Sequence, residues 1–195
     1  MKSNRILLKL ARPADAERIV EAIEVSALQN LSFFSGKRQL TVEEERAYLE
    51  KIARNPSEQL YLIICKDDDR LLGTVGLHDI DVVNRNARVG ITIFRSEDRG
   101  RGYATEALEA LIALAFTTWK LGADRNTLHK LYLNVFVENE RARKYYQRIG
   151  FEEFCVLPQH YLLNGQWHDM MHMVLFKSRW EALREISRFN LEPSA

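Results

Sequence analysis

The ten residues from Arg95 to Ala104, RSEDRGRGYA, place arginines and glycines where a strand is expected to meet the start of a helix. Gly100 and Gly102 allow positive φ and let main-chain N–H groups approach a ligand closely. A helix N-terminus carries unpaired N–H donors and about half a positive charge, so an anion is stabilised there. Arg99 and Arg101 can add charge-assisted hydrogen bonds. The pattern predicts a phosphate or pyrophosphate site; the alternative is a solvated loop with a glycine turn.

This turn does not match the more familiar nucleotide-binding motifs. The chain contains no G-x-x-x-x-G-K-[ST] sequence. The G-x-G that begins at Gly100 is not completed to G-x-G-x-x-G, because Thr105 occupies the last position. The predicted phosphate site therefore belongs to neither of these two loop types.

A second group of residues with chemical potential lies between Asn139 and Phe151. Asn139 stands where a helix N-cap belongs after a strand, and Gly150 stands where that helix ends. Tyr145 and Tyr146 are adjacent, so on a helix their side chains point about 100° apart. They are not expected to be buried alike, and one is expected to face a cleft. The alternative is that both belong to the core.

The elements that must position these residues follow from hydrophobic periodicity and capping signals. Strands are predicted at 5–10, 87–94, 130–137, 151–157 and 168–176, and two more flank the turn KDDDR at 66–70. Helices are predicted from Pro13 to Ala27, from the capping box of Thr41 and Glu44 to Arg54, at 102–119, at 139–150 and in a C-terminal extension, 177–195. Residues 29–40 and 120–129 are predicted as loops.

The order of these elements predicts an α+β fold. We expect a mixed, mostly antiparallel central sheet of about seven strands flanked by helices. The strand–helix–strand unit at 87–137 is expected to be parallel and right-handed. No repeat or linker divides the chain, so residues 1–195 are expected to form a single domain.

The composition argues against several classes of protein. Lysine plus arginine total 28 and aspartate plus glutamate total 27, so a net charge of +1 does not suggest nucleic-acid binding through a broad basic face. The charge-free apolar stretch from Ala110 to Trp119 is too short for a membrane helix, and the first residues do not resemble a signal peptide. The two cysteines form no CxxC pair, so we expect no metal site and a reducing, cytoplasmic compartment.

Together, the two motifs resemble those of the GCN5-related N-acetyltransferases, the GNAT superfamily. The acyl-CoA signature of that family is Arg or Gln, two residues, Gly, one residue, and Gly or Ala. It stands here as Arg99-Gly100-Arg101-Gly102-Tyr103-Ala104. The later family motif stands as Asn139, Ala142, Tyr146, Gly150 and Phe151. The closing run HYLLNGQWHDMMHMVL is similar to the branch containing ribosomal-protein N-terminal and spermidine acetyltransferases.

The resemblance implies that acetyl-CoA binds as cosubstrate in a V-shaped gap between the strands at 87–94 and 130–137. Main-chain groups at the end of the first strand would pair with the pantetheine arm, and the following turn would hold the pyrophosphate. Two residues of the later helix would lie near the thioester. The implied cofactor-binding residues are Ile93, Phe94, Arg95, Arg99, Gly100, Arg101, Gly102, Tyr103, Ala104, Thr105, Asn139 and Tyr146.

The resemblance also implies direct attack of a neutral amine on the thioester carbonyl in a ternary complex. Tyr146 would be the general acid that protonates the departing thiolate, a role that suits a phenol at neutral pH. The strand glutamate of many relatives is missing, because Arg88, Val89 and Gly90 stand there. The base or substrate-side group is expected to be His78 or Asp169; the alternatives are Asp79, Asp81, His160, His168 and His172.

The acceptor is expected to be a primary amine on a peptide N-terminus or on a small molecule such as a polyamine. Its pocket is expected between the helices at 14–54, the loop 29–40 and the segment 158–168. The aromatic residues there either line it or belong to the core: Phe33, Phe34, Tyr161 and Trp167. The acidic run Asp67 to Asp69 is interpreted as a solvated hairpin turn and not as a cation site.

Other functions remain open at this point. The missing glutamate is compatible with a non-catalytic, acyl-CoA-binding regulatory module. A nucleic-acid-binding module would rest only on the arginines and the helix at 139–149, and neither nucleic acid nor membrane is the expected partner. A homodimer is the expected assembly if copies associate, because dimers are the commonest oligomers.

Overall fold

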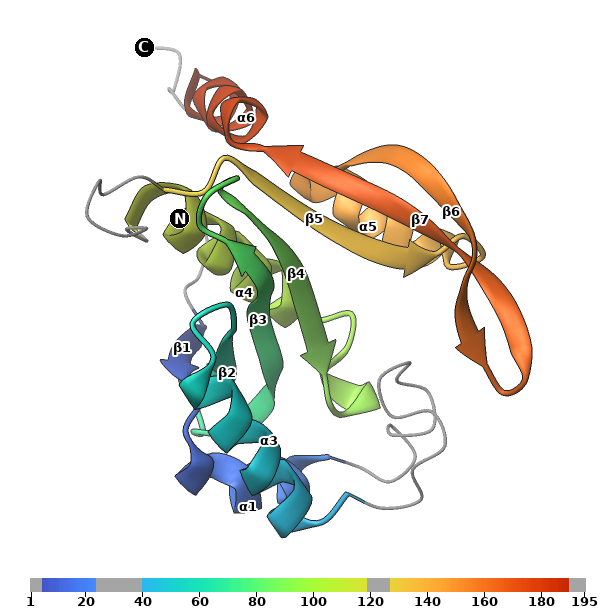
Figure 1. The fold of residues 1–195 in the computed structure, drawn as a ribbon. Coiled ribbons are helices and arrows are strands. Elements are labelled where there is room, and N and C mark those ends of the chain that lie inside the picture. Colours follow the sequence, from blue (N-terminus) through green and yellow to red (C-terminus); the bar gives the residue numbers. More distant parts are fainter. Residues whose placement is uncertain (1–4, 24–39, 119–126, 190–195) are drawn as a thin grey trace.

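The computed structural model describes residues 5–23, 40–118 and 127–189. Its centre is a seven-stranded sheet in the order β1-β2-β3-β4-β5-β7-β6 (Figure 1). Every neighbouring pair is antiparallel except β4 and β5, which are parallel. The predicted mixed, mostly antiparallel sheet is thus confirmed. The strands are β1 Ile6–Leu10, β2 Gln59–Cys65, β3 Leu71–Asp81, β4 Asn86–Ile93, β5 Lys130–Phe136, β6 Glu152–Leu163 and β7 Gln166–Phe176.

The sheet splits at its single parallel pair. β4 and β5 are in register only from Asn86 to Arg88 and from Lys130 to Tyr132. Beyond that point β5 stays paired with β7 along its whole length. Figure 1 shows β4 descending and β5 running to the right from a common origin. The predicted splay between these two strands is confirmed, and Arg88 marks its apex.

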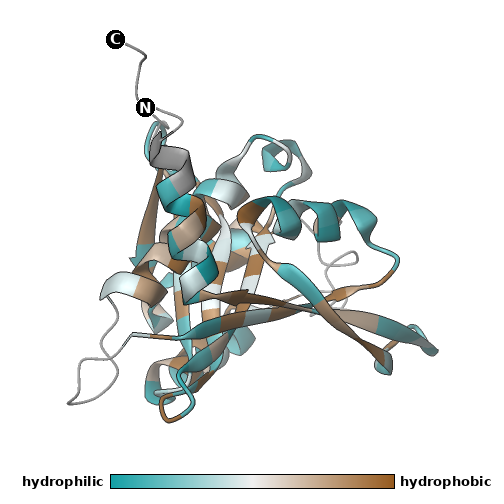
Figure 2. Ribbon diagram, turned by 90° about the horizontal axis from the view of Figure 1, so that it is seen from above, coloured by the Kyte–Doolittle hydropathy of each residue, from teal (hydrophilic) through white to brown (hydrophobic). Residues whose placement is uncertain are grey.

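Helices cover both faces of the sheet. They are α1 Ala16–Ala22, α3 Val42–Arg54, α4 Tyr103–Ala113, α5 Glu140–Ile149 and α6 Lys177–Phe189. One core cluster joins α4 to inward-facing residues of β2–β5 and β7, with α5 packed against it. A second cluster joins α1 and α3 to the opposite face of β2 and the adjoining ends of β3 and β4. Figure 2 shows hydrophobic residues concentrated along the central strands, whereas α5 is mostly hydrophilic.

The helix caps predicted from the sequence are present in the structure. Thr41 Oγ1 accepts from the Glu44 amide at 3.2 Å, and Glu44 accepts from the Thr41 amide at 3.1 Å, so the capping box begins α3 as predicted. The helix predicted from Pro13 begins as a 3₁₀ turn and continues as α1 to Ala22. The expected helical position Ala27 and the expected loop 29–40 lie outside the described residues, apart from Leu40.

The helix predicted at 102–119 is present as far as the structure describes it, to Thr118, but it changes type after Ala113. α4 ends at Ala113, and residues 114–118 form a π-helical turn. Thr117 Oγ1 donates to the Ala113 carbonyl at 2.6 Å, and the Leu128 amide donates to the Ala115 carbonyl at 3.2 Å. These two carbonyls are thereby engaged by contacts outside the regular α-helical backbone pattern.

The two last strands are longer than predicted. The segment 158–168 was expected to border the acceptor pocket between shorter strands, but β6 and β7 run through it and meet at the turn Asn164–Gly165. Pro158 does not end β6, because β6 is an edge strand and its register shifts between Leu157 and Tyr161. Edge strands and bulges are the places where a sheet tolerates proline.

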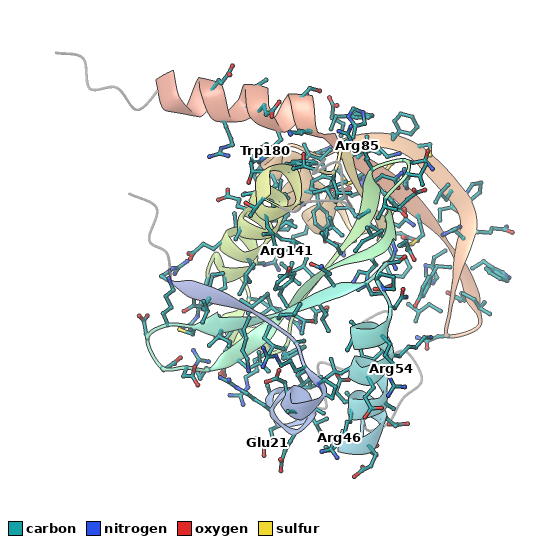
Figure 3. All side chains as sticks on the ribbon, turned by 60° about the vertical axis from the view of Figure 1, so that its left-hand side comes forward. Glu21, Arg46, Arg54, Arg85, Arg141 and Trp180 are labelled. Atoms are coloured by element: carbon teal, nitrogen blue, oxygen red, sulfur yellow. The ribbon has the colours of Figure 1, made fainter. Side chains whose placement is uncertain are left out.

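The C-terminal extension forms the expected helix, α6, which packs against the core. The Trp180 ring lies 5.4 Å from the Phe116 ring, and the Arg184 guanidinium stacks on Trp180 at 4.6 Å (Trp180 is labelled in Figure 3). Gly150 ends α5 with φ 118°. A Cβ at Gly150 would come within 2.7 Å of Leu183 on α6. The end of α5 and the side of α6 are therefore in close contact.

A pair of glycine substitutions tests this contact. Gly150→Ala adds both left-handed strain and a clash with α6, whereas Gly165→Ala, at φ 78°, adds strain in open space. Strain of this kind is expected to lower the free energy of unfolding by about 1–2 kcal/mol in both variants. Gly150→Ala is expected to lose about a further 1 kcal/mol. Chemical denaturation measures both, and equal losses would contradict packing of α6 on Gly150.

Candidate active site

The turn between β4 and α4 has the geometry of an anion site. A 3₁₀ turn at Ser96–Asp98 leads to Gly100 at φ 76° and Gly102 at φ 89°, so both glycines adopt the positive φ that the sequence predicted. Gly102 is the N-cap of α4, and no side chain caps the helix. The first amides of α4 consequently remain available to an external anion, which the positive end of the helix favours.

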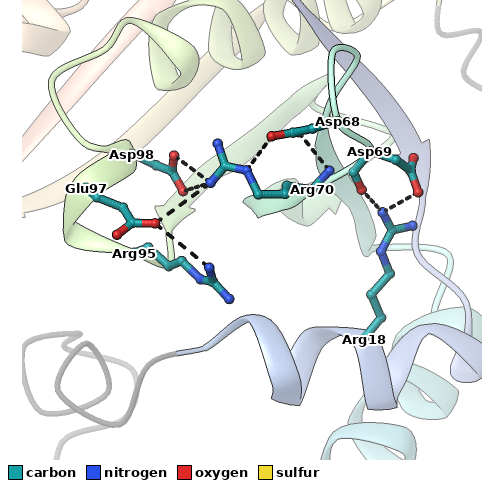
Figure 4. Close-up of polar contacts among 7 residues, drawn as sticks. All are labelled: Arg18, Asp68, Asp69, Arg70, Arg95, Glu97 and Asp98. Atoms are coloured by element: carbon teal, nitrogen blue, oxygen red, sulfur yellow. Dashed lines mark hydrogen bonds and ion pairs between the residues drawn. The ribbon is translucent and has the colours of Figure 1, made fainter.

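An ion-pair network connects this turn to the β2–β3 hairpin (Figure 4). Arg70 donates to both oxygens of Asp98 at 3.1 and 3.2 Å and to Asp68 at 2.6 Å. The Asp98 side chain is 1% exposed. The hydrogen bonds from Arg70 lower the pKa of Asp68 to about 2, and those to Asp68 and Asp98 raise the pKa of Arg70. The turn is therefore tied to the β2–β3 hairpin.

The acidic hairpin residues are thus more than solvated. Asp68 pairs with Arg70, and Asp69 pairs with Arg18 of α1 at 3.0 Å. Asp69 is nevertheless largely exposed, as expected of a hairpin turn. The interpretation of this run as a solvated hairpin turn holds, and two of its carboxylates are also ion paired. Within the described residues, no cluster of three or more His, Cys, Asp or Glu could hold a metal ion.

A second arginine, Arg5, holds the end of the turn where α4 begins. Arg5, just before β1, donates through Nε to Glu106 at 2.7 Å, and its backbone amide donates to the same carboxylate at 3.0 Å. Its Nη2 donates to the Arg101 carbonyl at 3.0 Å, and its guanidinium stacks on the Tyr103 ring at 4.8 Å. The beginning of α4 is therefore fastened to β1, as well as to the β2–β3 hairpin.

The three arginines of the turn have different roles. Arg99 is exposed, but its guanidinium donates to the carbonyls of Ile93 and Phe94 at 3.2–3.3 Å. It therefore satisfies backbone acceptors at the end of β4. Arg101 is exposed. Arg95 lies 3.9 Å from Glu97, and its buried Nε has no hydrogen-bond partner among the described residues. Arg95 and Arg101 are thus freer to meet an anion than Arg99.

The end of β4 offers its backbone selectively. The amide of Phe94 donates to the Leu72 carbonyl at 2.9 Å, so it is used within the sheet. Neighbouring residues of a strand direct their hydrogen-bonding groups to opposite sides. The amides of Ile93 and Arg95 therefore point to the open side of β4, where β5 has departed. The Ile93 carbonyl already accepts from Arg99, and the Arg95 carbonyl accepts from the Asp98 amide at 3.3 Å.

Helix α5 lies beside this turn on the same face of the sheet. Asn139 caps it, with Oδ1 accepting from the Ala142 amide at 3.0 Å, and Gly150 ends it, as predicted. Tyr145 and Tyr146 are both half-buried, with ring centroids 5.1 Å apart, so the expectation that they differ in burial is wrong. Both rings pack near the seam between α5 and the core.

Burial shapes the chemistry of the two phenols. It raises the pKa of Tyr146 to about 12 and also raises the pKa of Tyr145. The Tyr145 hydroxyl is buried beside Thr105 without a well-formed hydrogen bond. Tyr146 thus carries a proton throughout the neutral and mildly alkaline range, as a general acid requires.

The opposite face of the sheet carries the candidate bases. His78 on β3 stands opposite Arg88 on β4, at the apex of the splay, and Nδ1 of its ring lies 2.5 Å from Oε2 of Glu58. Arg88 is ion paired with Asp79 at 2.7 Å. Asp81 accepts from the amides of Val83 and Asn84, so it builds the β3–β4 turn.

Asp169 lies elsewhere. Its carboxylate accepts from the Gln159 amide at 2.7 Å, and its carbonyl accepts from the Val137 amide at 3.1 Å, beyond the end of β5. That is the open end of the splay, so the structure does not bring Asp169 and His78 together. The other candidate histidines also lie on β6 and β7: His160 is exposed, His168 contacts Glu138 at 3.3 Å, and His172 contacts Asn134 at 2.8 Å.

The fold agrees with comparisons to known proteins. A family model described as the acetyltransferase (GNAT) domain matches residues 5–152. The chain belongs to the GNAT acetyltransferase family. It is a GNAT-type N-acetyltransferase, and the resemblance seen in the two sequence motifs is confirmed.

Its relatives include a putative ribosomal and a spermidine N-acetyltransferase, the two kinds of enzyme in the branch that the sequence resembles. The "Putative ribosomal N-acetyltransferase YdaF" of Bacillus subtilis (strain 168) is 30% identical over 92% of this chain and 95% of its own. The "Spermidine N(1)-acetyltransferase" of Escherichia coli (strain K12) is 30% identical over 88% and 87%. The crystal structure of spermidine N-acetyltransferase from Vibrio cholerae in complex with CoA and spermine shares the fold, with a TM-score of 0.76 at 23% identity over 92% of this chain and 99% of that one.

Sequence reasoning missed one basic residue of this acetyltransferase. Arg141, in the first turn of α5, is exposed, and its Nη2 lies 3.9 Å from where a Cβ on Gly100 would be. Figure 3 labels it beside α4. The only sequence signal was a basic residue two positions after the Asn139 cap. That signal does not reveal which turn the residue approaches.

The aromatic residues proposed for the acceptor pocket are only partly placed. Phe33 and Phe34 lie outside the described residues. Tyr161 is half-buried with its ring 5.4 Å from that of Phe136, whereas Trp167 is 60% exposed. Tyr161 and Phe136 sit on β6 and β5, on the half of the sheet beyond the splay.

Substitution of Asp98 tests whether the ion-pair network holds the turn between β4 and α4. Asp98→Asn removes the buried charge that Arg70 contacts, so we expect the free energy of unfolding to fall by about 1–3 kcal/mol and acetyl-CoA to bind more weakly. Denaturation and calorimetric titration measure these two effects. Glu97→Gln is the matched control: its carboxylate is exposed and 3.9 Å from Arg70. Equal effects of the two changes would contradict the assignment.

Proposed function

We propose that this acetyltransferase moves an acetyl group from acetyl-CoA to a primary amine by direct attack in a ternary complex. The acceptor is a peptide N-terminus or a small amine such as a polyamine. One observation carries the proposal: the uncapped start of α4, with positive-φ glycines, lies at the end of β4 whose partner strand has diverged. A diphosphate and an extended arm fit that arrangement together.

The donor would be held from its phosphates inward. The amides from Gly100 to Ala104, together with Thr105, would face the pyrophosphate, and Arg101 and Arg141 add exposed positive charge. The Arg99 amide, expected to join them, instead donates to the Ser96 carbonyl at 3.1 Å. The pantetheine arm would pair with the open side of β4 through the amides of Ile93 and Arg95. Phe94 would contribute through its side chain, because its amide is bonded to Leu72 and its carbonyl to Arg99.

Tyr146 would supply the proton for the leaving group. Its buried phenol, with a pKa of about 12, stays protonated at neutral pH and donates to the thiolate as the C–S bond breaks. Asn139 uses Oδ1 as the cap of α5, which leaves its side-chain NH₂ free to contact the ligand near the thioester.

Of the two candidate bases, geometry favours His78. It stands at the apex of the splay, on the face of α1 and α3, which an amine would approach from the side opposite to Tyr146. Asp169 is engaged by the Gln159 amide at the open end. We keep Asp169 as a substrate-side group and not as the base.

Release of free CoA tests the proposed function. The full chain is mixed with acetyl-CoA and a panel of amines: spermidine, spermine, simple alkylamines and peptides with free N-termini. Turnover with at least one of these amines is expected. Saturable CoA binding without turnover across the panel would instead show a non-catalytic acyl-CoA-binding module.

Tyr146→Phe is expected to lower kcat about 10²–10⁴-fold, because a positioned proton donor contributes that much. The Kd of acetyl-CoA, measured by calorimetric titration, should remain within about twofold, since the ring is retained. In the unaltered enzyme, this phenol should cause no loss of rate between about pH 7 and pH 10, because its pKa is about 12. Unchanged kcat in the variant would remove Tyr146 from the mechanism.

Arg141→Gln is expected to raise the Kd of acetyl-CoA about tenfold, or ~1.4 kcal/mol, through loss of a charge beside the phosphates. The difference should shrink at high salt, because Arg141 is exposed and its charge is screened. Arg54→Gln is the control, with the same change in charge at the end of α3. Equal Kd values for Arg141→Gln and the unaltered enzyme would show that Arg141 does not bind the donor.

A further inference from the structure

The residue before β2 and a histidine on β3 form a close pair. Oε2 of Glu58 lies 2.5 Å from Nδ1 of His78, and the two side chains are 20% and 12% exposed. Because Gln59 is in register with Leu77, Glu58 and His78 are neighbours across the strands on the face of α1 and α3. A carboxylate at Nδ1 holds the proton there, so the lone pair of the neutral ring is at Nε2.

The ring is seated over two glycines. A Cβ on Gly90 would lie 2.9 Å from Nε2 of His78, and one on Gly76 would lie 3.2 Å from the same atom. Glycine in a strand interior weakens the strand and marks a close approach by another group. Here the approaching group is the imidazole, which lies across β3 and β4 with Nε2 over Gly90.

This position coincides with the apex of the splay. Gly90 is two residues beyond Arg88, the last residue of β4 that pairs with β5. It is also on the sheet face opposite to the cluster against which Tyr146 packs. Among the described residues, Nε2 of His78 has no hydrogen-bond partner. The free nitrogen of the pair thus lies where an acceptor amine would reach the reacting carbonyl.

We propose that Glu58 is the positioning residue for His78, and that this dyad accepts the proton of the acceptor ammonium group. The inference rests on the proposed function and deepens it. His78 Nε2 takes one proton from the ammonium, and the neutral nitrogen then forms the C–N bond as the C–S bond breaks. Tyr146 gives its proton to the thiolate and regains one, through solvent, from the acylated nitrogen. His78 releases its proton to solvent, so one proton is released in each turnover.

The charged groups around the dyad are compatible with this role. Arg88 faces the dyad from β4, but its guanidinium is paired with Asp79 and has no lone pair to accept a proton. On α3, Glu45 is buried, and Tyr48, whose pKa is raised by burial and by Glu45 and Glu58, lies near enough to Glu58 and Arg88 to feel their charges. None of these groups supplies a second neutral base at Nε2.

Two substitutions by glutamine test the dyad. At pH 7, His78→Gln is expected to lower kcat/KM for the amine about 10²-fold and Glu58→Gln about tenfold, with the Kd of acetyl-CoA unchanged. The amine used is the one that the unaltered enzyme acetylates fastest. Both deficits should shrink as the pH rises to about 9.5, because more of the amine is then already neutral. A purely structural defect would be independent of pH.

Further variants separate positioning from folding. Gly90→Ala displaces Nε2 without altering either member of the dyad, so it should reproduce the pH-dependent deficit. Glu58→Asp should recover part of the loss seen in Glu58→Gln. Glu138→Gln, in the other carboxylate–histidine pair, should leave kcat/KM unchanged. Thermal unfolding of each variant shows that it is folded.

The outcomes distinguish the dyad from the function on which it rests. If the unaltered enzyme acetylates an amine and His78→Gln is equally active, the dyad is overturned and the proposed function stands. A deficit in His78→Gln that persists unchanged at high pH also overturns the dyad. If the unaltered enzyme acetylates no amine, both proposals fail.

Discussion

The early end of the ladder between β4 and β5 is the constraint on which the rest of this structure depends. The two strands pair only at Asn86–Arg88 and Lys130–Tyr132, since β5 then follows β7. Backbone groups on the open side of β4 still require partners. Arg99 satisfies the carbonyls of Ile93 and Phe94 at the end of the strand. We propose that the remaining open positions receive the extended arm of the donor, with its phosphates at the start of the helix that follows.

The proposed anion site is held in place by two arginines, Arg70 and Arg5, whose side chains are paired within the protein. Arg70 holds the turn through Asp98, and Arg5 holds the first turn of α4 through Glu106. Because both are already paired, a ligand need not order the loop when it binds, which reduces the entropic loss on binding. The net charge of +1 does not reveal that some arginines are paired within the protein whereas others are exposed. The exposed charge near the glycines comes instead from the turn itself and from Arg141 on α5.

The sequence was informative wherever structure is determined locally. Asn139 and Gly150 begin and end α5 through contacts within a few residues, so the helix and its neighbouring strands could be predicted. Arg141 was missed because its approach to Gly100 exists only after α4 and α5 have packed. The π turn at 114–118 was also missed; the Leu128 amide that contacts it comes from a residue beyond the helix. The motif residues could be recognised as a set, but their partners could not.

The splay also determines how the two substrates are separated. Tyr146 packs with the cluster on the side of α4, whereas His78 lies on the side of α1 and α3. A donor that binds at the glycine turn and an amine that meets Nε2 of His78 would therefore approach the reacting carbon from opposite faces of one sheet. In the proposed reaction, donor recognition would depend on backbone groups of β4 and α4. Acceptor recognition would depend on side chains of the other face, which can differ without disturbing the donor site.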